Sequence, residues 1–257
     1  MHASEIFRLD GSVAVVTGST KGIGRAMVQG LAEAGASVVV SSRKQELCDE
    51  VAREVTESTG SPALGLACHV GQWDDIAGFV EQVTERLGRI DVLVNNAGIN
   101  PTHMTPSTMT LEYWHKVFAV NVEGPLRMSQ CVAPVMRDHG GGSIVNIASM
   151  AAYSGGPGIC AYGASKAALV NLTKSMSMEW APWGIRVNTL APGPFETEMV
   201  AGADRLQPGF RELIASGTRM GRVADASEIA GPVIYLASRA SSYVTGDEIA
   251  VCGGMQK

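Results

Sequence analysis

The chain has 257 residues, of which 18% are charged, and its formal net charge is −5 at pH 7. An acidic balance without clustered Lys and Arg argues against a nucleic-acid partner. No run approaches the roughly 18 apolar residues that a membrane span needs, so we expect no membrane contact and a cytoplasmic location. The five cysteines are scattered without metal-like spacing, which predicts reduced thiols and no bound metal.

Short β-branched runs alternate with segments of helical period, which is typical of βαβ units around a buried parallel sheet. We expect strands at residues 13–17, 37–41, 63–68, 92–95, 143–148, 186–190 and 248–251. We expect helices at residues 23–34, 43–58, 73–87, 111–138, 161–180 and 226–237, with a less regular stretch at 197–220. The prediction is an α/β fold with one domain over residues 1–257: a doubly wound, seven-stranded parallel sheet with helices on both faces. Residues from about 194 to 220 are expected to form a substrate-binding loop.

A glycine-rich turn directly follows the first predicted strand. Residues 17–24 read TGSTKGIG, and an apolar-periodic helix begins at once. Glycines let the backbone approach a phosphate, and the free N–H groups at a helix start attract an anion. Three glycines could also serve the turn alone, but the flanking strand and helix favour a pyrophosphate site. The residues predicted to form it are Gly18, Ser19, Thr20, Lys21, Gly22 and Gly24.

The end of the second predicted strand indicates which nicotinamide cofactor is used. An acid there would bond the ribose of NAD, whereas a cation accommodates the 2′-phosphate of NADP. The chain offers no acid but has Ser42 and Arg43, and Lys21 lies in the glycine turn. We therefore favour NADP(H), with NAD(H) as the alternative, since Arg43 could also be an ordinary solvated residue.

Three residues downstream suggest proton transfer. Ser149 ends the fifth predicted strand, and Tyr162 and Lys166 share a helix face because they are four residues apart. A phenol is protonated at neutral pH, so a nearby ammonium and a positive nicotinamide ring would be needed to favour its phenolate. We expect Tyr162 to exchange a proton with a reacting oxygen that Ser149 binds. A tyrosine and a lysine at this spacing can also be a simple surface pair.

The ordered motifs resemble those of the classical short-chain dehydrogenase/reductase family. They comprise TGSTKGIG at 17–24, NNAG at 95–98, Asn121, Ser149, YGASK at 162–166 and PG at 192–193. The resemblance covers nearly the whole chain, and its combination of motifs is specific. It implies a Rossmann fold, hydride transfer with a nicotinamide cofactor, and subunits that pair through long helices, usually as homotetramers.

The resemblance also implies roles for individual residues. Asn121 resembles the residue whose backbone anchors a water in a proton relay to Lys166, and it could equally kink a long helix. Lys166 would also bind the nicotinamide ribose, beside Tyr162. The further residues that the resemblance places at the cofactor are Ile23, Val70, Asn95, Ala97, Gly98, Ile99, Ala148, Pro192, Gly193 and Thr197.

Two positions depart from the family's commonest pattern. His69 stands where many relatives have an Asp that bonds the adenine amine, so we expect it at the cofactor through a ring nitrogen. Cys252 also stands where an Asp is frequent. The segments VVVSSRKQ at 38–45 and CHVG at 68–71 are similar to the dehydrogenase/reductase member 4 branch and related bacterial enzymes, which implies NADPH-linked ketone reduction.

Loops at the carboxyl ends of the strands should wall the substrate pocket. Besides Ser149 and Tyr162, the candidate residues are Asn100, Met150, Tyr153, Phe195 and Met199. Most are apolar, which favours a small apolar ketone or secondary alcohol. Three alternatives stay open: a 3-oxoacyl-carrier-protein reductase, an NAD-dependent sugar-acid or hydroxysteroid dehydrogenase, and a non-enzymatic dinucleotide sensor on the same scaffold.

Overall fold

The computed structural model describes residues 5–101, 104–156 and 158–255. Its centre is a seven-stranded sheet in the order β3-β2-β1-β4-β5-β6-β7, with every pair of neighbours parallel. The strands are β1 Val13–Thr17, β2 Ser37–Ser41, β3 Ala63–Gly65, β4 Val92–Asn95, β5 Gly142–Ile147, β6 Ile185–Pro192 and β7 Glu248–Val251. The strand order reverses between β1 and β4, which is where sheets of this type bind ligands at their carboxyl edge.

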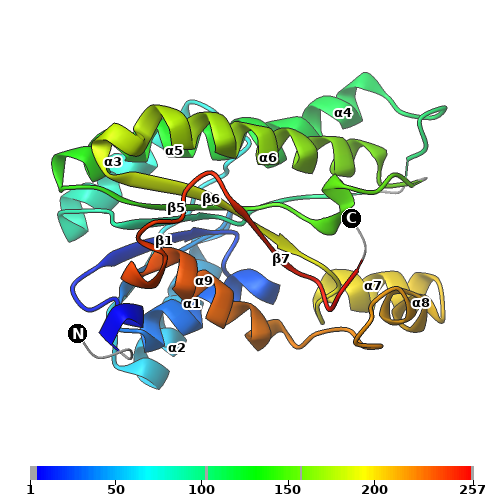
Figure 1. Cartoon of the computed structure of the whole chain (residues 1–257), viewed down its shortest axis with the longest axis horizontal. Helices are drawn as coiled ribbons and strands as arrows, with labels where there is room; N and C mark the ends of the chain where they lie inside the picture. The colour runs from blue at the N-terminus through cyan, green and yellow to red at the C-terminus, as the bar shows by residue number, and fades with distance from the viewer. Residues whose placement is uncertain (1–4, 102–103, 157, 256–257) are drawn as a thin grey trace.

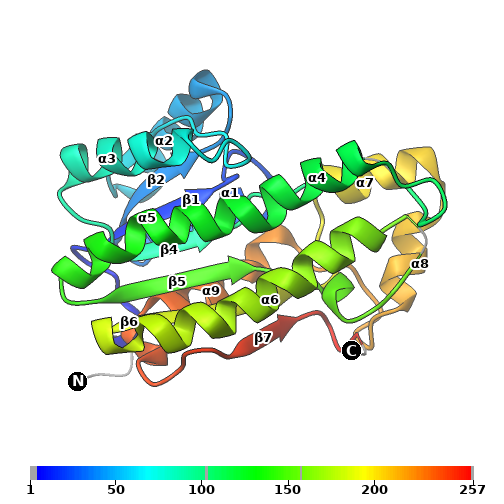
Figure 2. The ribbon, with the colours of Figure 1, turned by 90° about the horizontal axis from the view of Figure 1, so that it is seen from above.

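Two helical layers cover the sheet (Figure 1), with α3, α5 and α6 on one face and α1, α2 and α9 on the other. The helices are α1 Gly22–Glu33, α2 Gln45–Thr59, α3 Asp75–Leu87, α4 Leu111–Phe118, α5 Gly124–Asp138, α6 Cys160–Trp180, α7 Glu198–Leu206, α8 Phe210–Ser216 and α9 Ala230–Ala237. Strands β5 and β7 run toward the end of the molecule where α7 and α8 lie (Figure 2). None of the described helices has the length and apolar character that crossing a bilayer requires.

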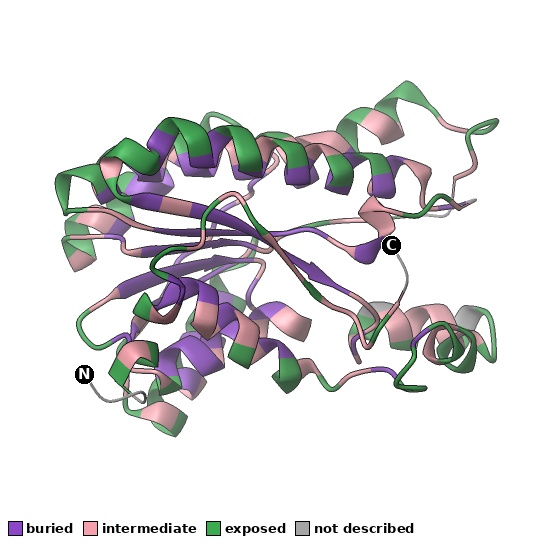
Figure 3. Cartoon of the chain, in the orientation of Figure 1, coloured by how far each residue is buried: buried purple, intermediate pink, exposed green. Residues whose placement is uncertain are grey.

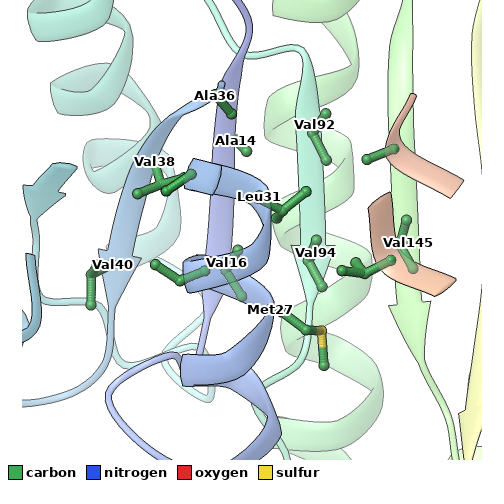
Figure 4. Close-up of a cluster of buried hydrophobic side chains, with 14 of the residues drawn as sticks. Ala14, Val16, Met27, Leu31, Ala36, Val38, Val40, Val92, Val94 and Val145 are labelled. Atoms are coloured by element: carbon green, nitrogen blue, oxygen red, sulfur yellow. The ribbon is translucent and has the colours of Figure 1, made fainter. Parts of the chain in front are cut away.

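The strands are apolar on both faces because helices cover both. All five residues of β1 are buried, and alternate residues feed two separate clusters. Val16 and Val38 pack with Met27 and Leu31 of α1 on one face (Figure 4). The helices turn their buried sides inward and their exposed sides to solvent (Figure 3).

Five strands each contribute one polar residue to a row across the sheet, near its carboxyl edge. The strand registers pair Thr17 with Ser41, Asn95 with Asn146, and Asn146 with Thr189. Thr17 and Asn95 each follow the paired residues Val16 and Val94, so the row is continuous. All five side chains are at most 2% exposed and lie on the face covered by α3, α5 and α6. We call these five residues the polar row.

The predicted elements are found, with different limits at several ends. β3 stops at Gly65, although Leu66 N and Cys68 N still donate to β2 and its exit at Val40 O and Ser42 O. The helix expected at 226–237 begins as the 3₁₀ turn Ala226–Ile229.

Two segments differ from the expected regularity, one less regular and one more regular. The helix predicted at 111–138 is interrupted by a π-turn, Ala119–Glu123, between α4 and α5. Gly124 N bonds to Ala119 O, five residues back, so the ladder widens by one residue there. The stretch 197–220, expected to be irregular, contains α7 and α8.

Candidate active site

The three side chains expected to act on a substrate lie together at the carboxyl end of β5 and on α6. Ser149 follows β5 and caps the 3₁₀ turn Met150–Ala152. Tyr162 and Lys166 lie one turn apart on α6, and the Lys166 Nζ is 5.7 Å from the centroid of the Tyr162 ring. Tyr162 is hydrogen-bonded to Ser149. The structure thus assembles all three groups into one constellation.

The Lys166 ammonium is hydrogen-bonded to the backbone of β5. Its side chain is only 3% exposed, and Nζ donates to Ile147 O at 2.7 Å. Burial lowers the pKa of the Lys166 ammonium to about 8, because removing a charge from water disfavours the charged form. Lys166 can therefore gain or lose a proton near neutral pH.

Tyr162 differs from the expectation of an acidified phenol. Burial raises its pKa above the ordinary value, and the hydrogen bond with Ser149 opposes this only in part. The acidifying charge that the chemistry requires therefore has to come partly from outside the protein's own side chains, as from a positively charged cofactor ring.

The Ser149 hydroxyl is oriented by the turn that it caps. Its Oγ accepts a hydrogen bond from Ala151 N at 3.1 Å. Because a hydroxyl has one proton and this contact uses a lone pair, the proton remains available to Tyr162 or to a substrate oxygen. Ser149 is thus placed to donate to the atom on which Tyr162 acts.

Asn121 lies in the π-turn and is fully buried. Its Oδ1 accepts from Ile99 N at 2.8 Å, and its Nδ2 donates to Ile99 O and to Ser165 Oγ, both at 3.0 Å. The sequence-based alternative, a residue that interrupts a long helix, holds as well, since the π-turn is centred there. The side chain of Asn121 joins the segment after β4 to α6.

The glycine turn packs tightly against the segment that follows β4. A Cβ on Gly18 would lie 2.8 Å from Ala97 Cα, and one on Gly24 would lie 2.4 Å from both Asn96 Nδ2 and Gly18 O. Asn96 Nδ2 donates to Thr17 O at 2.9 Å and to Gly18 O at 3.0 Å. These two glycines are therefore needed for the loop to reach its position.

The start of α1 is suited to bind an anion. Its N-cap residue, Lys21, is extended and makes no side-chain cap, so the first-turn N–H groups of this 12-residue helix have no side-chain partner from that position. Lys21 Nζ instead pairs with Glu198 of α7 at 2.8 Å, with both side chains about 70% exposed. Ile23 packs against the core behind the turn.

Ser19, Ser42 and Arg43 differ in burial and in hydrogen-bond partners. Ser19 is fully buried, and its Oγ donates to Val16 O at 2.7 Å and accepts from Ser41 N at 2.9 Å, so its side chain ties β1 to β2. The Ser42 hydroxyl contacts Cys48 Sγ at 3.3 Å. Arg43 is exposed. The side chain of Ser19 is therefore structural, and Arg43 is the residue free to meet a phosphate in solvent.

The residues present fit a dinucleotide phosphate. A glycine turn leads into a helix start without a side-chain cap, and two cations flank it. The buried Ser41 Oγ has no hydrogen-bond partner among the described residues, so a polar atom at the end of β2 is left unsatisfied. No acidic side chain follows β2 directly. Among the described residues, no group of three His, Cys, Asp or Glu could hold a metal ion.

His69 is oriented by the backbone after β3. Its Nδ1 is 3.1 Å from Gly71 N and accepts that N–H. A neutral imidazole with an accepting Nδ1 carries its proton on Nε2, so the ring presents a donor where relatives with an Asp present an acceptor. Beside it, the carbonyl of Val70 packs so closely on α5 that Gly124 has no room for a Cβ.

The remaining residues expected at the cofactor line the same carboxyl edge. The backbone of Ile99 is bonded on both sides to Asn121. Gly193 follows β6 and lies against Cys252, because a Cβ on it would be 2.7 Å from Cys252 Cα. Thr197 caps α7, and its methyl group lies 3.4 Å from the position of a Cβ on Gly22. Ala148 is buried and directly follows β5, and Pro192 is the buried last residue of β6.

The residues expected to wall the substrate pocket differ in exposure. Phe195 is 3% exposed and belongs to the core cluster around α1 and α9, and Met150 is 4% exposed. The place of both residues in the pocket wall stays a prediction. The backbone of Met199 lies on α7, and its side chain falls outside the described part of the chain.

Two other wall candidates are bonded within the protein. The Tyr153 ring packs against Ala148, Val170 and Ala191, and its hydroxyl bonds to Glu248 of β7. Tyr153 thus contacts α6 and β7, and its place in the pocket wall stays a prediction. Asn100 stays near the site, where its Oδ1 accepts from Tyr113 at 3.1 Å.

Several residues that shape the site were given no role of their own from the sequence. Asn96, noted only as part of the NNAG motif, fixes the glycine turn, and Asn146, Ser165 and Thr173 bond to the elements that hold Lys166. Asn146 had a detectable signal, since it is a polar residue inside an otherwise apolar strand. The two hydroxyl residues had none, because Ser and Thr are common on helices.

Known proteins share this sequence and this geometry. The family described as "Enoyl-(Acyl carrier protein) reductase" matches residues 18–256. Dehydrogenase/reductase SDR family member 4 of Homo sapiens is 40% identical over 249 residues, covering 96% of this chain and 88% of that protein. The chain belongs to the classical short-chain dehydrogenase/reductase family. This short-chain dehydrogenase/reductase is therefore an oxidoreductase, as its motifs predicted.

Solved structures of other family members superimpose on almost the whole chain. A gluconate 5-dehydrogenase from Burkholderia cenocepacia J2315, in complex with NADP and tartrate, has a TM-score of 0.94 and 38% identity, covering 99% of this chain and 98% of that one. A 3-oxoacyl (acyl-carrier-protein) reductase from Agrobacterium tumefaciens C58 with NADP bound has a TM-score of 0.92 and 33% identity, with the same coverage. The Rossmann fold predicted for this short-chain dehydrogenase/reductase is confirmed.

Proposed function

We propose that the protein is an NADP(H)-dependent oxidoreductase that interconverts a ketone or aldehyde and an alcohol, with Tyr162 as general acid and base. The observation that carries this proposal is the grouping of Ser149, Tyr162 and Lys166 at the carboxyl edge of the sheet. A dinucleotide sensor would not need a phenol, a hydroxyl donor and a buried ammonium in contact.

The cofactor preference is supported by charge at the end of β2. Arg43 is exposed and can form two hydrogen bonds to a phosphate, and Lys21 lies in the neighbouring glycine turn. The two solved relatives named above contain NADP. NADP(H) is therefore the expected cofactor, with NAD(H) as a weaker substitute.

Tyr162, Ser149 and Lys166 have different roles in the proton transfer. The bound nicotinamide would supply or accept the hydride. Tyr162 gives a proton to the carbonyl oxygen in reduction and takes it back in oxidation, while Ser149 donates a hydrogen bond to the same oxygen. Lys166, with a pKa of about 8, adds positive potential beside the phenol and would bind the ribose hydroxyls of the cofactor. Asn121 holds the backbone of Ile99 against α6 and keeps this arrangement in place.

The substrate class follows from what the carboxyl edge presents. The loops there offer the polar groups of Asn100, Ser149 and Tyr162, and the candidate wall has no cluster of Arg or Lys for a phosphorylated substrate. Because the wall candidates Met150, Phe195 and Met199 are apolar, the proposed substrate is a small apolar ketone or secondary alcohol. We further propose a homotetramer, paired through its long helices, in the cytoplasm.

A screen of NADPH oxidation tests the proposal. Purified protein is mixed with aliphatic, aryl and cyclic ketones, with 5-ketogluconate and with a 3-oxoacyl thioester, and each reaction is repeated with NADH. We expect turnover with apolar ketones and NADPH at least tenfold above NADH. Preference for 5-ketogluconate would favour a sugar-acid dehydrogenase, and preference for the thioester would favour a 3-oxoacyl reductase. No turnover with any carbonyl, despite NADPH binding, would favour the dinucleotide sensor.

A further inference from the structure

Helix α6 is joined to the end of β4 and the segment after it by two hydrogen-bonded bridges, one at either side of Lys166. The first bridge consists of Ile99, Asn121 and Ser165. Asn121 accepts from Ile99 N through Oδ1 at 2.8 Å and donates through Nδ2 to Ser165 Oγ at 3.0 Å. Asn121 and Ser165 are both fully buried. The first bridge therefore meets α6 at the residue before Lys166.

The second bridge consists of Asn95, Asn146 and Thr173. Asn95 and Asn146 belong to the polar row, and Asn95 Nδ2 donates to Asn146 Oδ1 at 2.8 Å. Asn146 Nδ2 then donates to Thr173 Oγ1 on α6 at 2.9 Å. Asn146 also precedes Ile147, whose carbonyl accepts from Lys166. This bridge meets α6 about two turns after Lys166, on the same side of the helix.

In both bridges the asparagine donates its amide N–H to a hydroxyl on α6. Ser165 donates its hydroxyl proton to Tyr162 O at 2.7 Å, and Thr173 donates its own to Leu169 O at 2.9 Å. Since a hydroxyl has one proton, each can only accept from its asparagine. Each asparagine must then point its amide nitrogen at α6 and its oxygen at the β4 side. Neither bridge can be satisfied with the asparagine amide turned over.

Both bridges begin in the segment 95–99, which also touches the lysine directly. A Cβ on Gly98 would lie 3.2 Å from Lys166 Nζ and 3.4 Å from Asn121 Oδ1. The ammonium, its backbone acceptor and both ends of the helix segment around it are thus set by one short stretch of chain. The position of α6 relative to this stretch decides where Tyr162 and Lys166 point.

We propose that Ser165, Asn146 and Thr173 are positioning residues, which hold α6 at the height and rotation where Tyr162 and Lys166 exchange a proton with the substrate. None of the three is expected to touch substrate or cofactor. They act through the helix backbone at Tyr162 and Leu169 and through β5. The inference rests on the proposed function, because the reaction defines what the correct position is.

A matched control exists on the same helix. Ser177 is 5% exposed, and its hydroxyl donates to Lys174 O at 2.7 Å, the same bond three residues back that Ser165 makes. It belongs to neither bridge and lies about three turns beyond Lys166. Ser177→Ala therefore removes a buried hydroxyl from α6 while both bridges remain.

The test compares two bridge variants, Ser165→Ala and Thr173→Val, with two controls. The controls are Ser177→Ala and Thr173→Ser, which keeps a hydroxyl at position 173. We measure the pH profile of kcat with the best ketone, the unfolding free energy, and the titration of Lys166 by NMR of protein labelled with [ε-¹³C]lysine. We expect kcat to fall roughly tenfold for each bridge variant, as for a small misplacement of catalytic groups. The Lys166 midpoint should rise from about 8 toward the ordinary value of 10.5, as its burial loosens.

Ser177→Ala and Thr173→Ser should keep kcat within about twofold and keep the wild-type Lys166 midpoint. The proposal fails if Ser165→Ala loses stability like Ser177→Ala while kcat and the Lys166 midpoint stay unchanged, because the role is then structural only. Should Thr173→Val not fold, Ser165→Ala against Ser177→Ala decides. Should wild-type protein reduce no carbonyl, the proposed function fails, and the Lys166 midpoint alone still tests the bridges.

Discussion

The side of the site built on α6 and the side built on α7 are held by opposite means. Around α6, Asn121, Asn146 and Lys166 are at most 3% exposed and bonded at 2.7 to 3.0 Å. Around α7, the contacts are surface ion pairs, such as Lys21 with Glu198, where both side chains are about 70% exposed. Buried polar bonds have strict geometry, whereas exposed pairs contribute little and tolerate change. The difference suggests a fixed centre for the chemistry and an adaptable wall for the substrate.

Removing the Tyr162 hydroxyl should give the largest effect of all. In Tyr162→Phe the proton donor is lost while the ring still packs, so kcat should fall by about 10³- to 10⁴-fold. The Kd for NADPH, measured by fluorescence titration, should stay within about twofold. Retained turnover would show that another group transfers the proton.

The buried ammonium should give a pH-dependent stability. The folded pKa of Lys166, about 8, lies below the ordinary 10.5, so the unfolded chain binds more protons between these values. Stability should therefore rise as pH increases from 8 toward 10.5, and the cost of the buried charge is fully present below pH 8. At about 1.4 kcal/mol per unit of pKa, the rise is roughly 3 kcal/mol.

Urea unfolding of the wild type and of Lys166→Met, between pH 7.5 and 10, measures this rise as the difference between the two. Tyr162 works in the opposite direction only above pH 10, because burial raises its pKa. Equal slopes for the two proteins would contradict the buried charge.

An exposed cation should matter less, and only for one cofactor. Arg43→Ala should weaken NADPH binding about 10- to 100-fold, as for the loss of charge-assisted hydrogen bonds, and leave NADH unchanged. Lys44→Ala removes the neighbouring exposed cation and serves as the matched control. Fluorescence titration of the wild type and both variants with NADPH and NADH measures the Kd values. If Arg43→Ala keeps the wild-type preference for NADPH over NADH, Arg43 does not determine that preference.

The smallest effect is expected at the ion pair between the glycine turn and α7. Glu198→Gln should free Lys21 and tighten NADPH binding less than about fivefold, since exposed pairs contribute about 0.2–1 kcal/mol. Glu196→Gln is the control, because Glu196 pairs with Arg211 rather than with Lys21. Added salt should reduce the difference between the variants. A change above tenfold would mean that α7 is more firmly held than its exposure indicates.

The two sides of the site also differ in how far the sequence predicts them. The spacing of Tyr162 and Lys166 and the glycine turn were readable, because helix period and turn chemistry are local properties. The burial of Phe195 and the contact of Tyr153 with β7 were not readable, because which way a loop side chain turns depends on packing against distant elements. Asn146 could have been noticed as a polar residue in a buried strand, but its partner on α6 could not.

The π-turn at Ala119–Glu123 makes the long α4–α5 segment sensitive to length as well as to composition. Shortening it by one residue would restore regular four-residue bonding and keep α5 in phase with α4, because the wider turn holds one extra residue. Asn121, at the centre of the turn, would then be displaced from Ile99 and Ser165. An apparent irregularity in the helix is thus what lets one continuous segment serve both the core and the reacting centre.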